Sequence, residues 1–242
     1  MKKQYPGKNT GVNQSNKMCG IFGSTKFKLY EKLYSFNRTR GTFAGGSLYV
    51  KPCSDLYIKK WQGKQYVNEL TGFYAWAHEY RLFMGHTQAP TGAQREYTKQ
   101  TTHPFETNNW IVAHNGVLEN NKQLEMELLQ HLDNPIPPVD SAIIPALLDD
   151  VYVGDDVQAI EQVCGMLKGT FACWIYSKMG KQAYLVRSGC TLLGSIETSS
   201  FSSIYVPRVA ESLLDEGVIY CITDEGLATV GTFEQSSPFY IL

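Results

Sequence analysis

Short hydrophobic runs and amphipathic stretches alternate along this chain in three blocks. Brief runs of β-branched or aromatic residues, bounded by Gly, Asn or Thr, predict strands in the first block at 21–24, 47–51, 56–61, 82–85 and 110–114. Apolar residues at helical spacing predict helices at 30–36, 67–76, 122–132, 140–148 and 157–167. The last third returns to predicted strands, at 170–176, 183–187, 192–193, 218–222, 227–230 and 239–242. Strands, then adjacent helices, then strands indicate a layered α+β domain rather than regular βαβ winding.

Two of the predicted helices have candidate N-caps. Asn120 or Asn121 stands before the helix at 122–132, and Asp140 stands at the start of the next one. No internal repeat and no linker composition interrupts the pattern. We therefore expect one domain.

Composition narrows the class of protein. The 242 residues include 22 basic and 23 acidic side chains, a formal net charge of −1 that argues against nucleic-acid and anionic-membrane binding. No apolar run approaches the roughly 20 residues that a membrane span requires. Six scattered cysteines without a CxxC pair favour reduced thiols, and hence a cytoplasmic location, over a disulfide framework.

The start of the chain places a cysteine in a special position. Residues 1–18 are polar and lack the apolar segment of a secretory signal, so we expect a flexible leader or propeptide, or a true start at Met18, before a domain at 19–242. Loss of the leader, or a start at Met18 followed by removal of that methionine, would leave Cys19 with both a thiol and a terminal α-amine. The ordinary pKa of that amine, about 7.7–8.0, suits a base for the same residue's side chain. The alternative is a half-buried strand cysteine without a chemical role.

A second cluster follows the predicted strand at 110–114. His114, Asn115 and Gly116 come before a helix, and a strand that ends in Asn-Gly brings a side-chain amide and a backbone N–H close to one point. Two such donors can stabilise an oxyanion. The alternative is an ordinary Asn-Gly turn.

Eight short motifs in a fixed order resemble a known family. They are Cys19-Gly20-Ile21-Phe22-Gly23, Arg40-Gly41 with Gly46, Gly85-His86-Thr87 with Thr91, His103-Pro104, His114-Asn115-Gly116 with Glu119-Asn120, Asp140-Ser141, Leu167-Lys168-Gly169 and Arg187-Ser188-Gly189. This series, from Cys19 to about Val230, resembles the class II glutamine amidotransferase domain of the N-terminal nucleophile (Ntn) hydrolases. It looks most like the glutaminase half of glucosamine-6-phosphate synthase.

The resemblance implies a four-layer αββα sandwich and hydrolysis of the side-chain amide of L-glutamine through a γ-glutamyl thioester. By position, Cys19 matches the nucleophile, and its α-amine would act as base and then as acid. Asn115, through its amide, and Gly116, through its backbone N–H, match the oxyanion hole. Asp140 matches the carboxylate that pairs with the substrate α-ammonium, and Thr91 matches a ligand of the α-carboxylate.

Two departures from the family pattern affect these expectations. The family normally has Arg where this chain has Gln88, and arginine binds a carboxylate with two charge-assisted bonds that a neutral amide cannot replace. Arg95, in the same loop, is a candidate to restore the charge, with a surface arginine as the alternative. The segment 40–46 also lacks the Asp-Ser pair that the family has before its last glycine, which affects local loop structure more than chemistry.

Three functions are compatible with these residues. The first is a cytoplasmic glutaminase that releases ammonia for a separate synthetase or transferase subunit. The second keeps the fold and the nucleophile but acts on another amide, with Gln88 as its motivation. The third is a catalytically silent regulatory or binding subunit. We expect no cofactor and no metal, because the spacings of His86, His103 and His114 do not resemble a zinc site.

Overall fold

Two antiparallel sheets form the centre of the computed structural model, which describes residues 19–62, 75–89, 97–130 and 136–235. Sheet A has seven strands in the order β11-β9-β10-β1-β4-β2-β3, and sheet B has six in the order β13-β12-β8-β7-β6-β5. The strands of sheet A are β1 (Gly20–Ser24), β2 (Ala44–Val50), β3 (Leu56–Gln62), β4 (Leu82–Gln88), β9 (Leu193–Ser195), β10 (Ser200–Ser202) and β11 (Ser212–Leu213). Those of sheet B are β5 (Phe105–Glu106), β6 (Trp110–Leu118), β7 (Gly169–Ser177), β8 (Gln182–Ser188), β12 (Val218–Thr223) and β13 (Gly226–Thr232).

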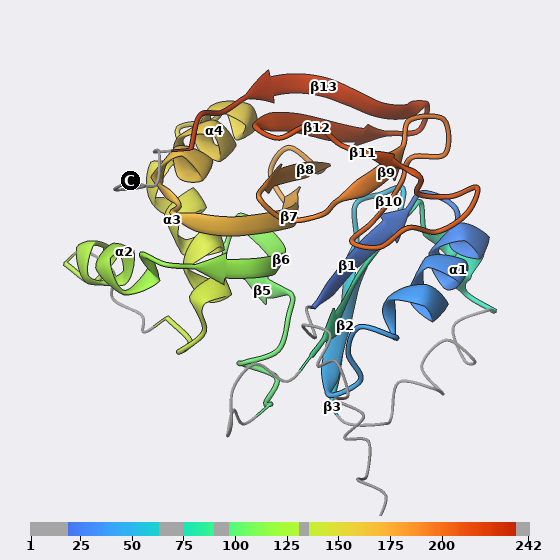
Figure 1. The fold of residues 1–242 in the computed structure, drawn as a ribbon, viewed down its shortest axis with the longest axis horizontal. Coiled ribbons are helices and arrows are strands. Elements are labelled where there is room, and N and C mark those ends of the chain that lie inside the picture. Colours follow the sequence, from blue (N-terminus) through green and yellow to red (C-terminus); the bar gives the residue numbers. More distant parts are fainter. Residues whose placement is uncertain (1–18, 63–74, 90–96, 131–135, 236–242) are drawn as a thin grey trace, which may run out of the picture.

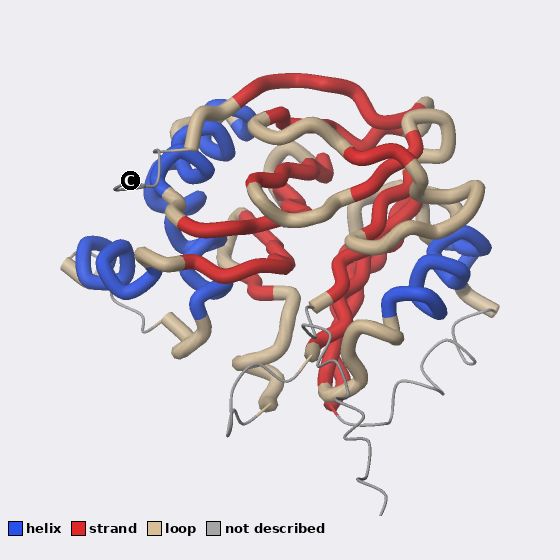
Figure 2. Tube along the Cα trace, in the orientation of Figure 1, coloured by secondary structure: helices blue, strands red, loops and turns tan. Residues whose placement is uncertain are grey.

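Helices cover the outer faces of both sheets. The helix α1 (Phe27–Asn37) packs on sheet A, and α3 (Ile143–Val151) and α4 (Asp156–Met166) pack on sheet B beside α2 (Asn121–Leu128). Figures 1 and 2 show α1 on one side of the molecule and the other three helices on the opposite side, with the sheets between them. Two short 3-10 helices, η2 (Ala77–Glu79) and η3 (Asp140–Ala142), complete the described elements. The predicted single α+β domain with an αββα sandwich is confirmed.

Strand alternation explains how the layers hold together. In β1, Ile21 belongs to the apolar core between the sheets, whereas the next residue, Phe22, belongs to the core beneath α1. Neighbouring side chains of a strand point to opposite faces, so β1 is buried on both sides. A polar contact also joins the sheets, because the Trp174 indole N–H of β7 donates to the carbonyl of Gly85 in β4 at 3.0 Å. The nucleophile candidate, Cys19, therefore precedes a strand that is packed from both faces.

Most predicted elements are confirmed, with three differences. The strand expected to end at Asn115-Gly116 continues to Leu118 and stays paired with β7. Asp140 does not cap a helix: it begins η3, Ala142 precedes α3, and the Asp140 carboxylate instead accepts from the backbone N–H of Ser141, at 2.8 Å. Asn120 does stand at the N-cap of α2, but its side chain donates to the carbonyl of Met166 at the end of α4 and accepts from the backbone N–H of Lys168.

Some predictions fall outside the described residues. These are the leader 1–18, most of the helix predicted at 67–76, the end of the helix predicted at 122–132, and the strand predicted at 239–242. Within the described part of the chain, no helix is long and apolar enough to cross a membrane.

Candidate active site

The candidate nucleophile stands at the entrance to an interior strand of sheet A. Cys19 is half-buried and comes directly before β1, which lies between β4 and β10. Gly20 pairs with Thr87 of β4, so the next residues along the two antiparallel strands are Cys19 and Gln88. This register places Gln88, which is fully buried, at the same end of the sheet as Cys19.

The candidate oxyanion residues come from sheet B. Asn115 is 1% exposed on β6, and its amide nitrogen lies 3.5 Å from the hydroxyl oxygen of Ser203. That hydroxyl also accepts from the backbone N–H of Ile21, at 2.9 Å, two residues after Cys19. One serine hydroxyl therefore links Asn115 of sheet B to the strand that carries Cys19.

Gly116 adopts a backbone conformation that favours glycine. Its φ is +146°, and a Cβ at this position would lie 2.0 Å from the carbonyl oxygen of Thr170 on β7. The backbone of β6 can approach β7 this closely only without a side chain at this position. The Asn-Gly pair therefore marks a close approach between two strands rather than a hairpin turn.

We predict that Gly116→Ala lowers the free energy of unfolding by more than the roughly 1–3 kcal/mol of backbone strain alone, because alanine also clashes with Thr170. Chemical denaturation measures the loss. Gly154→Ala is the matched control, since Gly154 also has positive φ (+101°) but nothing lies within 4 Å of its added Cβ. A loss at Gly116 no larger than that at Gly154 would contradict the clash.

Asp140 lies beside the far end of the same strand. Its second carboxylate oxygen is 3.4 Å from the backbone nitrogen of Leu118, three residues after Asn115. Ser141 links it to His114, whose Nδ1 lies 2.9 Å from the serine hydroxyl. Burial lowers the pKa of His114, although the nearby Asp140 carboxylate and a bond to the backbone of Thr170 oppose the shift. A neutral His114 bonded to Ser141 suits a structural role.

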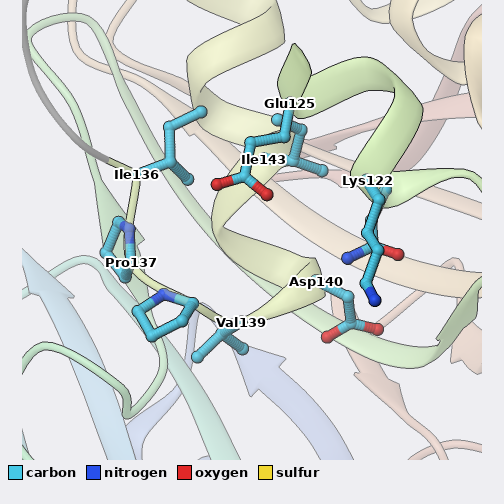
Figure 3. A pocket seen from close by; sticks show the side chains of 9 residues that line it. Lys122, Glu125, Ile136, Pro137, Val139, Asp140 and Ile143 are labelled. Atoms are coloured by element: carbon cyan, nitrogen blue, oxygen red, sulfur yellow. The ribbon is translucent and has the colours of Figure 1, made fainter. Parts of the chain in front are cut away.

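A pocket open to solvent gives Asp140 an accessible side (Figure 3). Lys122 and Glu125 extend from α2 across from the segment that contains Ile136, Pro137 and Val139. The full lining is Asn121, Lys122, Glu125, Ile136, Pro137, Pro138, Val139, Asp140 and Ile143. The Asp140 carboxylate therefore borders both the candidate oxyanion strand and a water-accessible pocket of mixed charge.

Two residues near Cys19 were not assigned roles from the sequence. Arg40 donates to the carbonyl of Ser203, at 2.9 Å, and partial burial lowers the pKa of its guanidinium while the Cys190 and Cys19 thiols act in the opposite direction. Arg40 belongs to one of the recognised motifs, so the sequence could have indicated it as a residue of the site. Ser203 lies in a serine-rich segment, and nothing in its spacing distinguishes it from a turn residue.

Two predicted site residues, Thr91 and Arg95, lie outside the described part of the chain. The structure does place the departure at 40–46: Gly41 packs against the backbone of Gln88, and the backbone N–H of Phe43 donates to the Gln88 carbonyl at 3.2 Å. No cluster of three or more His, Cys, Asp or Glu suited to a metal occurs among the described residues.

Comparison with known proteins supports the resemblance drawn from the motifs. A family model described as a glutamine amidotransferase domain matches residues 91–198. The chain is 27% identical over 165 residues to a glutamine–fructose-6-phosphate aminotransferase (isomerizing) from Caldanaerobacter subterraneus subsp. tengcongensis, a match that covers 66% of this chain and 27% of that protein. The family model spans the motifs from His103-Pro104 to Arg187-Ser188-Gly189, and the chain is similar there to glutamine amidotransferases. The resemblance drawn from the motifs is thereby confirmed.

Two further proteins are similar to this chain in sequence or in fold. A 7-cyano-7-deazaguanine synthase 2 from Sulfurisphaera tokodaii is 33% identical over 86 residues, which cover 35% of this chain and 17% of the synthase. The fold matches that of glutamine phosphoribosylpyrophosphate amidotransferase from B. subtilis, with a TM-score of 0.70 and 20% identity over 88% of this chain and 49% of the other. The chain thus spans about a quarter of the first of these relatives and half of the solved structure.

Proposed function

We propose that this amidotransferase domain hydrolyses the side-chain amide of L-glutamine and supplies ammonia to a separate acceptor enzyme. The observation that carries the proposal is the link through Ser203, which brings Asn115 of one sheet to the strand behind Cys19 of the other. A nucleophile beside a buried amide donor is the arrangement that acyl transfer requires. The catalytic proposal also requires that residues 1–18 are absent from the active protein.

The proposed reaction has two halves. The Cys19 thiolate attacks the side-chain carbonyl carbon of glutamine, and the carbon–nitrogen bond breaks as the α-amine of Cys19 returns a proton to the departing ammonia. Water then attacks the resulting thioester, which releases glutamate and restores the thiol. In both steps the amide of Asn115 and the backbone N–H of Gly116 would stabilise the negative oxygen.

Substrate recognition is proposed to depend on the α-carbon groups of glutamine. Asp140, which borders the open pocket, would bind the α-ammonium. Thr91 and the amide of Gln88 would bind the α-carboxylate, and Arg95 would supply the positive charge that Gln88 lacks. An acceptor domain or subunit is inferred because the aligned part makes up only 27% of the aminotransferase and 17% of the synthase.

A second candidate function follows from Gln88. A buried neutral amide in place of arginine weakens the selection for a carboxylate, so an amide without that group is the alternative substrate.

Three substrates separate these functions. We expect protein that begins at Cys19 to release ammonia from L-glutamine at a kcat/KM at least about tenfold above that for 4-aminobutanamide, which lacks the carboxylate, because charged hydrogen bonds contribute more than neutral ones. Glutaramate, which lacks the ammonium paired with Asp140, should lose a similar factor. Coupled glutamate and ammonia assays give the rates. An equal or higher rate on 4-aminobutanamide would favour the second candidate, and no turnover of any amide would support a silent subunit.

A further inference from the structure

Ser203 occupies a junction between the two halves of the candidate active site. It follows β10 directly and is 0% exposed. Its hydroxyl accepts from the backbone N–H of Ile21 at 2.9 Å and donates to the carbonyl of the same residue at 3.2 Å. The Asn115 amide nitrogen approaches the same oxygen at 3.5 Å. The hydroxyl therefore contacts the nucleophile strand and the oxyanion residue at once.

The geometry of an amide makes this contact directional. The NH₂ group of asparagine carries two N–H bonds in one plane, about 120° apart, so the direction of one fixes the direction of the other. If one N–H of Asn115 is directed to Ser203, the second is held at a fixed angle to it. A distance of 3.5 Å is long for a resting hydrogen bond, and such bonds tighten when substrate is bound.

The backbone of Ser203 anchors the junction independently of its hydroxyl. Its N–H donates to the carbonyl of Ile21 at 2.9 Å, and its carbonyl accepts from Arg40 at 2.9 Å. These bonds survive replacement of the side chain. The effect of the hydroxyl on Asn115 can therefore be separated from the attachment of β1 to this segment.

We propose that Ser203 is a positioning residue of the glutaminase site: its hydroxyl holds the Asn115 amide so that the second N–H faces the developing oxyanion. The proposal rests on the proposed function. Ser203 has no part in bond making or breaking in this proposal. It acts by keeping a donor from sheet B in register with a nucleophile from sheet A.

The kinetic test is a double-mutant cycle. Ser203→Ala in protein that begins at Cys19 is expected to lower kcat for glutamine by about 10- to 100-fold with little change in KM. A misoriented Asn115 amide would stabilise the transition state less, whereas the binding of substrate would stay the same. In the Asn115→Ala background the same change should have less than about a twofold effect, because the amide that it orients is gone. An undiminished loss in that background would overturn the proposal.

A matched variant controls for packing. Ser200→Ala also removes a fully buried hydroxyl from the same segment, but Ser200 bonds Ser24 and Thr198 instead of Asn115. Its kcat should remain within about twofold of the parent protein. Ser203→Cys keeps a side chain of similar shape with a weaker acceptor, so it repeats the test if the alanine variant folds poorly. A loss of thermal stability without a loss of kcat would overturn the positioning role.

An NMR measurement that needs no catalysis separates the positioning role of Ser203 from the proposed glutaminase activity. The side-chain NH₂ signals of Asn115 in ¹⁵N NMR, assigned by their absence in Asn115→Ala, report the environment of both hydrogens. We expect these signals to shift in Ser203→Ala and to stay in place in Ser200→Ala. Unchanged signals in Ser203→Ala would refute the positioning role even in an active enzyme, whereas absent glutaminase activity with shifted signals would refute the proposed function alone.

Discussion

Replacement of Cys19 by alanine should remove glutamate release from glutamine, with a loss on the order of 10⁶-fold. The reason is that the proposed thioester forms on the Cys19 sulfur, which alanine lacks. The side chain is small and half-buried, so the fold should persist, as thermal unfolding would verify. Glutamate assays on protein that begins at residue 19 measure the effect.

Two comparisons make this result specific. Cys53→Ala changes an exposed cysteine between β2 and β3 and should leave the rate unaltered. Protein whose intact mass shows residues 1–18 still attached should be as inactive as Cys19→Ala, because a peptide bond removes the basic α-amine. Equal rates in Cys19→Ala and the parent protein would rule out the proposed mechanism.

Replacement of Asn115 by alanine should lower kcat by about 10²–10³-fold with little effect on KM, the usual cost of one oxyanion donor. In the proposed mechanism the amide stabilises charge that appears only as the carbonyl is attacked, so its loss would affect the transition state more than the bound substrate. Steady-state kinetics with glutamine separate the two parameters.

The control for Asn115 lies at the other end of the same strand. Asn109, just before β6, is half-buried and donates to Asp149 at 2.9 Å, so Asn109→Ala removes a comparable bond outside the site. Its kcat should remain close to that of the parent protein. A rise in KM for Asn115→Ala at constant kcat would instead place the amide among the ground-state contacts.

The sequence predicted the strands and helices whose residues bury apolar faces. Strand β7 is an example, because seven of its residues in succession are buried and the run is rich in aromatic and small apolar residues. Strand β10 was missed because two of its three residues are serines, although all three are buried against β1 and β9. Both hydroxyls are satisfied, since that of Ser200 donates to Ser24 of β1 and that of Ser202 accepts from Asn37 of α1, so burial leaves no hydrophobic pattern.

The sequence indicated most residues of the candidate site but not how they come together in space. Cys19, Asn115 and Asp140 belong to recognisable motifs, whereas Ser203 belongs to none. Its importance follows from contacts with residues 88 and 182 positions away, which no local pattern reveals. The assignment of Asp140 as a helix cap was wrong for a related reason: its carboxylate bonds Ser141 and approaches Leu118 on β6.

The interior place of β1 in sheet A also bears on when the enzyme can become active. The strand behind Cys19 is made first on the ribosome, yet its neighbours include β10 and Ser203, and the Ile21–Ser203 bond spans 182 positions. Contacts of such long range form late in folding. A nascent chain therefore carries its thiol without the framework that directs it until most of the domain has been synthesised. Under the proposed function, glutamine hydrolysis would therefore begin only once the domain is complete.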